Sequence, residues 1–122
     1  MILIGDEIVS CESICRISKI DDIKSTKPNS TIIFDFNVDI MTYCKNNGLQ
    51  YGVIISTIKE AIYANALKAK YIVADITLAS KVQKVAQNYM FDSRVLAIIE
   101  DSDQIEQVAL FEIDGVILSH LL

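Results

Sequence analysis

The chain has 122 residues, a formal net charge of −5 and a hydrophobic content of 52 %. This length and composition predict one folded domain over residues 1–122 and exclude wholesale disorder, because enough apolar side chains are present for a full core. The acidic charge argues against nucleic-acid binding, and no apolar run approaches the roughly 18 residues of a membrane span, so we expect no direct membrane insertion.

The N-terminal residues 1–7 predict a strand. Ile2 to Ile4 form a short apolar run that stops at Gly5-Asp6, and no basic segment precedes it. A secretory signal peptide begins with a basic region, so this segment does not match one. We therefore expect a cytoplasmic protein, whose cysteines at positions 11, 15 and 44 are free thiols.

Residues 10–30 show a weaker pattern than the rest of the chain. Between residues 10 and 23, isoleucines recur every three residues, at Ile14, Ile17, Ile20 and Ile23. This spacing predicts one or two helical turns, although the serines and aspartates between them weaken the pattern. Pro28 then disfavours helix at the residue before it, which predicts a connector over residues 24–30.

Apolar runs alternate with helix-like stretches over the remainder of the chain. The runs comprise residues 31–36, 51–55, 71–75, 94–99 and 115–118. Nearly continuous apolar strands are buried on both faces, which indicates a parallel sheet with helices above and below it. We predict an α/β fold, a three-layer, doubly wound, Rossmann-like sheet of about six strands in the order 3-2-1-4-5-6. We favour this open sheet over a closed eight-stranded barrel, because such a barrel needs about 200 residues or more.

Helix boundary signals accompany this rhythm. Asn37 and Thr77 are placed to cap helices, and Asn46-Asn47-Gly48 is a helix stop. Thr57 and Glu60 have the spacing of a capping box. A last helix is expected to open at residues 101–103.

The carboxyl ends of the predicted strands are where ligands bind in such a sheet. Asp35 ends the second strand, where a ribose hydroxyl is held in dinucleotide-binding folds, although capping of the next helix explains the same residue. Of the motif G-x-G-x-x-G only Gly5 is present, and the carboxylates of Asp6 and Glu7 would repel a phosphate. We expect no catalytic or metal-binding residues, since the single histidine, His120, has no partners that would form a catalytic set.

Four segments, in their order and spacing, resemble the TrkA-N or RCK domains, which regulate potassium channels and transporters. They are Ile32-Ile33-Phe34-Asp35, Ile54-Ile55-Ser56-Thr57, Arg94-Val95-Leu96-Ala97 and residues 113–119. The departures fall on strands one and three, at the nucleotide site, so the resemblance implies a degenerate member that has lost the usual ligand.

The resemblance implies a non-enzymatic regulatory or interaction domain that forms a homodimer and acts on a membrane transporter or channel. No cofactor is expected, and a weakly bound adenine nucleotide would lie over Gly5, Asp35 and Ser56. The apolar residues Leu121 and Leu122 are a second hint of dimerisation, since exposed apolar patches mark contacts.

Two alternatives stay open. The first is a small enzyme or receiver-like phospho-acceptor, in which Asp6, Asp35 and Asp75 would cluster at the strand ends. The second is half of a phosphate-binding barrel that closes by dimerising. This last alternative requires a curved sheet, which sequence does not reveal.

Overall fold

The computed structural model describes all residues 1–122, and its centre is a seven-stranded sheet in which every neighbouring pair is parallel. The prediction of an α/β fold with a parallel sheet is confirmed. The strands are β1 (Ile2–Ile4), β2 (Ile14–Arg16), β3 (Thr31–Asp35), β4 (Tyr51–Ile54), β5 (Tyr71–Ala74), β6 (Arg94–Ile99) and β7 (Gly115–Leu118).

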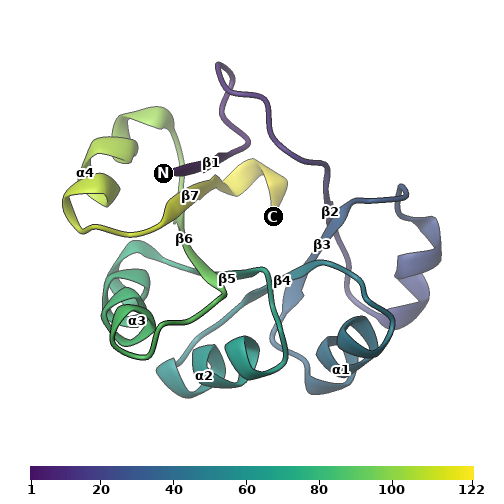
Figure 1. Ribbon diagram of the computed structural model, residues 1–122. Helices are drawn as coiled ribbons and strands as arrows, with labels where there is room; N and C mark the ends of the chain where they lie inside the picture. The colour runs from purple at the N-terminus through teal and green to yellow at the C-terminus, as the bar shows by residue number, and fades with distance from the viewer.

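The strand order is β1-β7-β6-β5-β4-β3-β2, and the sheet curls strongly into a half-barrel (Figure 1). The predicted order 3-2-1-4-5-6 is wrong, because β1 lies at an edge of the sheet rather than at its centre. The observed order runs without reversal from β2 to β7 and continues with β1. This is the cyclic order of a closed barrel in which one pair, β1 with β2, has been left unjoined; we call this gap the seam.

All four α-helices lie on the outer face of the curled sheet (Figure 1). They are α1 (Val38–Asn46), α2 (Ile58–Ala66), α3 (Ile76–Asn88) and α4 (Ile105–Leu110). The prediction of helices on both faces is therefore wrong. Crossovers between parallel strands are right-handed, so a sheet that adds each new strand on the same side places every helix on the same face. Helices reach the second face only where the order reverses, and here it does not.

The core between the sheet and the helices is the larger of two buried clusters and contains 24 residues. Each of the four helices contributes to it, among others through Met41, Ala61, Val82 and Val108. Phe34 and Tyr51, both buried in this core, stack with ring centroids 5.4 Å apart. Such stacking adds to the burial of two large rings and fixes β3 against β4.

The inner face of the curl is also apolar. Its cluster consists of six buried strand residues, Ile4, Ile33, Tyr71, Val73, Leu96 and Ile117, and includes no helix residue. Leu121 and Leu122 pack against this cluster and are half-buried. The inference that these two leucines form an exposed apolar tail is therefore wrong, because they cover the inner face of their own sheet.

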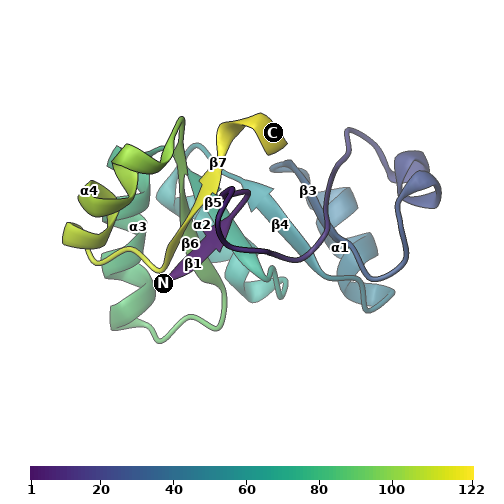
Figure 2. The ribbon, with the colours of Figure 1, turned by 90° about the horizontal axis from the view of Figure 1, so that it is seen from above.

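Two short segments cover the open side of the curl. Residues 6–13, which we call the strap, cross from β1 to β2 (Figures 1 and 2). The 3₁₀ turn η3 (Ser119–Leu121) follows β7 and contacts β2 across the seam. The two unpaired edges, β1 and β2, are only three residues long, as is usual for edge strands that must not pair with other chains.

The segment predicted as helical turns divides in two. Residues Ile14–Arg16 are strand β2, which the prediction missed, whereas Ile20–Ser25 form the 3₁₀ helix η1. A 3₁₀ helix has three residues per turn, so the three-residue spacing of Ile20 and Ile23 matches η1. The three cysteines are free, as expected.

The helix boundaries follow the sequence signals with one exception. Asn37 accepts a hydrogen bond from the backbone of Ile40, and Gly48 has a φ of 65° just beyond α1, as a helix stop requires. The cap of α3 is Asp75 and not Thr77. Asp75 is therefore the single residue that joins β5 to α3. No helix in the structure combines the length and the apolar composition needed to cross a bilayer.

Candidate functional site

The predicted ligand-binding residues lie at the carboxyl edge of the sheet but do not form one site. Asp35 is the last residue of β3 and Ser56 follows the neighbouring strand β4, whereas Gly5 follows β1, which three other strands separate from β4. A ligand crevice in an open parallel sheet forms where the strand order reverses. Since this order contains no reversal, the physical reason for grouping these residues is absent.

Gly5 makes room for the chain itself. Its φ is 88°, in the left-handed region that favours glycine, and a Cβ placed there would lie 2.8 Å from Cδ1 of Leu121. The close approach that glycine permits is therefore an approach by the turn η3. In a nucleotide-binding motif, the space beside Gly5 would be occupied by a phosphate group instead.

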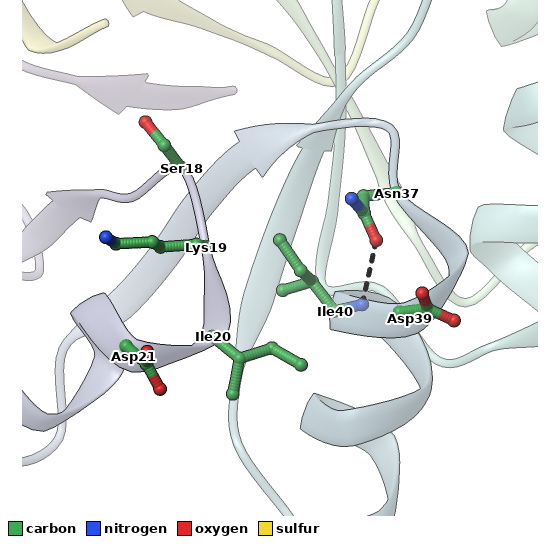
Figure 3. A pocket seen from close by; sticks show the side chains of 7 residues that line it. All are labelled: Ser18, Lys19, Ile20, Asp21, Asn37, Asp39 and Ile40. Atoms are coloured by element: carbon green, nitrogen blue, oxygen red, sulfur yellow. Dashed lines mark hydrogen bonds between the residues drawn. The ribbon is translucent and has the colours of Figure 1, made fainter.

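Asp35 pairs with Arg16 on the neighbouring edge strand, at 3.1 Å from carboxylate oxygen to guanidinium nitrogen. Beside this pair, residues 18–21 and the start of α1 line an open hollow of about 260 Å³ (Figure 3). Lys19 extends away from Asn37 in this view, and Asp21 and Asp39 supply negative charge. The hollow is polar and open, and it offers no concentration of positive charge for an anion.

Ser56 takes part in the start of α2. Its backbone N–H donates to Oε1 of Glu60 at 2.7 Å, and the backbone N–H of Glu60 donates to Oγ1 of Thr57 at 3.1 Å. The predicted capping role of Thr57 and Glu60 is confirmed, with the glutamate reaching one residue further back than the motif requires. The backbone of Ser56 is thus already engaged by the fold.

The three aspartates of the alternative prediction do not cluster. Asp6, Asp35 and Asp75 lie at the carboxyl ends of β1, β3 and β5, no two of which are neighbours. Asp6 accepts from the backbone of Ile8, and Asp75 accepts from the backbone of Leu78. No group of three histidine, cysteine or acidic side chains is arranged to hold a metal ion. The expected gathering of these carboxylates is therefore wrong.

A second hollow lies at the carboxyl ends of β1, β7 and β6. It has a volume of about 260 Å³, and its lining includes Asp6, Glu7, Glu100, Asp101 and His120. The hydroxyl of Ser119 donates to Oε2 of Glu100 at 2.9 Å and ties η3 to the end of β6. The lining contains four acidic residues and one histidine, and this excess of negative charge makes the hollow unsuitable for a phosphate.

The most connected polar cluster lies at the opposite, amino edge of the sheet. Glu12 of the strap accepts hydrogen bonds from the hydroxyls of Thr31 and Tyr71 and pairs with Nζ of Lys70 at 2.7 Å. Gly52 on β4 makes room for Ile33 and for the base of the Tyr71 side chain, since a Cβ there would lie 2.8 Å from Cδ1 of Ile33 and 3.1 Å from Cβ of Tyr71. We call these four side chains, Glu12, Thr31, Lys70 and Tyr71, the strap latch.

The strap latch contains an ionised carboxylate and a protonated phenol. Burial by itself raises the pKa of Glu12, but hydrogen bonds from Lys70, Thr31 and Tyr71 outweigh burial and hold that pKa below its usual 4.5. Burial and the hydrogen bond to Glu12 raise the pKa of Tyr71. In closed β/α barrels, residues at the amino ends of the strands serve stability rather than catalysis, and we assign the strap latch the same stabilising role.

Replacing Glu12 with glutamine is expected to lower the free energy of unfolding by about 1 kcal/mol at neutral pH. Because the folded pKa of Glu12 is lowered, its carboxylate stabilises the fold above the unfolded value of 4.5, and this stabilisation disappears as the pH falls through the folded value. Urea unfolding at several pH values measures the difference from the wild type. Glu7→Gln, an exposed change in the same strap, is the control, and a Glu12→Gln deficit that does not shrink in acid would contradict the ionised latch.

An apolar groove lies on the outer surface between α1 and α2. It has a volume of about 480 Å³ and is lined by Phe36, Val38, Thr57, Lys59, Glu60, Tyr63 and Leu67. Helix α2 packs closely against α3, but no comparable contact joins α1 to α2. The groove was not predicted from the sequence. Apolar residues on the solvent side of both helices, such as Val38 and Tyr63, were the feature of the sequence that could have indicated it.

No protein-family model matches the chain, and no curated protein matches its sequence.

Proposed function

We propose that this chain is a non-enzymatic interaction domain that forms a homodimer and exerts a regulatory effect through protein contacts. One observation carries this proposal: polar groups at the carboxyl edge of the sheet are engaged within the domain, while apolar side chains are exposed on the helices. The carboxyl edge of the sheet, where parallel α/β proteins bind small molecules, is used by the fold itself. Large apolar side chains instead face solvent on the helices.

The carboxyl edge supports the proposal residue by residue. Gly5 is covered by Leu121, Asp35 is paired with Arg16, and the backbone of Ser56 is bound by Glu60. Asp75 caps α3 and Asp101 caps the short turn before α4. A carboxylate or hydroxyl that already satisfies a helix start is a poor candidate for acid, base or nucleophile.

The outer helices supply the contact surface. On α1, α2 and the end of α4, large apolar side chains are about half exposed or more, and they comprise Val38, Ile62, Tyr63, Leu110 and Phe111. Single exposed apolar residues are common, but Val38 and Tyr63 of this set line the α1–α2 groove together, and an exposed apolar groove is typical of a protein-binding surface.

The resemblance to TrkA-N and RCK domains adds a membrane transporter or channel as the regulated partner. This part of the proposal rests on short sequence segments alone, because the strand order differs from that of a Rossmann sheet. The interaction domain itself does not depend on the resemblance.

A ligand screen by thermal shift tests the proposal. NAD, NADH, ATP, ADP, AMP and Mg²⁺ are each added at millimolar concentration, and we expect no stabilisation by any of them. A ligand present at about 100 times its dissociation constant would add roughly 2.7 kcal/mol, which corresponds to an increase in Tm of about 10 °C for a chain of this size. An increase in Tm with an adenine nucleotide would show that a nucleotide site exists. An increase in Tm with Mg²⁺ alone would favour the alternative of a small enzyme that uses carboxylates at the strand ends.

A further inference from the structure

We propose that the α1–α2 groove is the surface on which a second copy of this chain docks, so that two copies pack their α1–α2 faces together across a twofold axis. This inference rests on the proposed function, which requires a protein contact, and it names the partner and the face. Three properties of the groove support it: its shape, its charge and its self-complementarity.

The shape comes from an incomplete helical layer. Helices α2 and α3 pack together through close contacts, whereas between α1 and α2 the surface falls to Phe36 and Leu67, which are only partly buried. Both residues pack on the main core, so the groove reaches from solvent to the core of the domain. A side chain that filled it would bury apolar surface on both partners, which is the main favourable contribution to association.

The charge of this face differs from that of the rest of the protein. Residues 36–67, which include α1, β4 and α2, contain two acidic side chains, Asp39 and Glu60, and two basic ones, Lys45 and Lys59. The whole chain has a net charge of −5, so all of its excess negative charge lies outside this segment. A second copy can therefore approach this face with less repulsion than any acidic face offers.

The rim of the groove is complementary to itself. Val38 is 53 % exposed and Tyr63 is 50 % exposed, and they stand on opposite sides of the hollow that both line. In a twofold interface each residue that one copy inserts is matched by the same residue from the other copy. The adjacent and oppositely charged Lys59 and Glu60 let the same symmetry place a lysine of one copy near a glutamate of the other.

The seam is a poorer docking surface than the groove. Two copies that closed a barrel edge to edge would have to pair β1 or β2 with the other chain. The strap and η3 cross the open side at this place, and the edge strands are three residues long. The dimer that the half-barrel alternative requires would displace both segments and break the contacts of the strap latch.

Sedimentation velocity of the full chain over a range of concentrations tests the inference, with Val38→Asp and Tyr63→Glu as variants. Asp at the first position of a helix is favourable, and Glu is a good helix former, so both exposed changes should preserve folding. The matched control is Ile8→Asp in the strap, the same apolar-to-acidic change at a side chain that is 92 % exposed. Circular dichroism checks that all three variants fold.

We expect the wild type and Ile8→Asp to dimerise at about 100 µM and each groove variant to weaken the dimer at least roughly tenfold. A monomeric wild type at this concentration would overturn the inference, and so would a dimer that both groove variants leave intact. A monomeric wild type would also remove the homodimer from the proposed function, whereas a dimer that both groove variants leave intact would overturn the docking face alone. The ligand screen tests the non-enzymatic role separately.

Discussion

Replacing Gly115 with valine is expected to lower the free energy of unfolding by about 3 kcal/mol or more. Gly115 begins β7 and pairs with Ile2 of β1. A Cβ at this position would clash with the carbonyl oxygen of Ile2 and would lie 2.9 Å from Cδ2 of Leu96. The first contact is with backbone in a paired strand, so β1 would have to separate from β7. Urea unfolding followed by circular dichroism measures the loss.

Gly48→Asn is the control for this substitution. Gly48 has a φ of 65°, which asparagine tolerates, and no atom lies within 4 Å of the position that a Cβ would take there. We expect its free energy of unfolding to stay within about 0.5 kcal/mol of the wild type. If Gly115→Val proved as stable as this control, the close pairing of β1 with β7 would be contradicted.

Replacing Leu96 with alanine is expected to cost about 2 to 5 kcal/mol, the range for large-to-small changes in a packed core. Leu96 is fully buried on the inner face of the curl, where no helix covers the sheet. The prediction follows from the strand-only cluster being a core and not the wall of a cavity. Chemical denaturation measures the change.

Leu110→Ala provides the comparison, because Leu110 ends α4 and is 79 % exposed. Its replacement should change stability by no more than about 0.5 kcal/mol. A Leu96→Ala variant with the same small effect would mean that the inner face is loosely packed, and it would reopen the inner face as a site for a ligand.

The parallel sheet was predictable because burial on both faces leaves a direct pattern in the sequence. Residues 71–74 and 115–118 are buried at every position. The apolar pattern does not show whether helices or other strands cover each face of the sheet. A doubly wound sheet is covered by helices on each face, whereas this sheet is covered by helices outside and by the opposite wall of its own curl inside. Both coverings select the same apolar residues, so the strand order could not be read from them.

Strand β2 shows a second limit of the sequence. Ile14–Arg16 contains one isoleucine, one cysteine and one arginine, and its edge position leaves it only half-buried or exposed. Neither an apolar run nor a clear alternation is present in three residues. Without β2 only six strands are evident in the sequence, so the cyclic order of the seven strands could not be predicted.

The candidate site residues lie at the strand ends, as the sequence predicts, whereas their binding roles stay predictions. Asp35, Ser56 and Asp75 lie at the carboxyl edge, where Glu60 binds the backbone N–H of Ser56, Asp75 accepts from the backbone of Leu78, and Arg16 on the next strand pairs with Asp35. The strap latch shows the reverse case. Glu12 meets Thr31, Lys70 and Tyr71 across as many as 59 positions of sequence, and such contacts leave no local signal.

Backbone NMR tests the strand order most directly, through nuclear Overhauser contacts between the strands of the labelled protein. The structure predicts contacts between Leu3 and Val116, which pair in register, and a hydrogen-bonded amide at Ile2, whose N–H donates to the carbonyl of Asp114. Contacts from β1 to β3 in place of β7 would instead show β1 at the centre of a Rossmann sheet. That result would contradict the half-barrel and, with it, the placement of all four helices on one face.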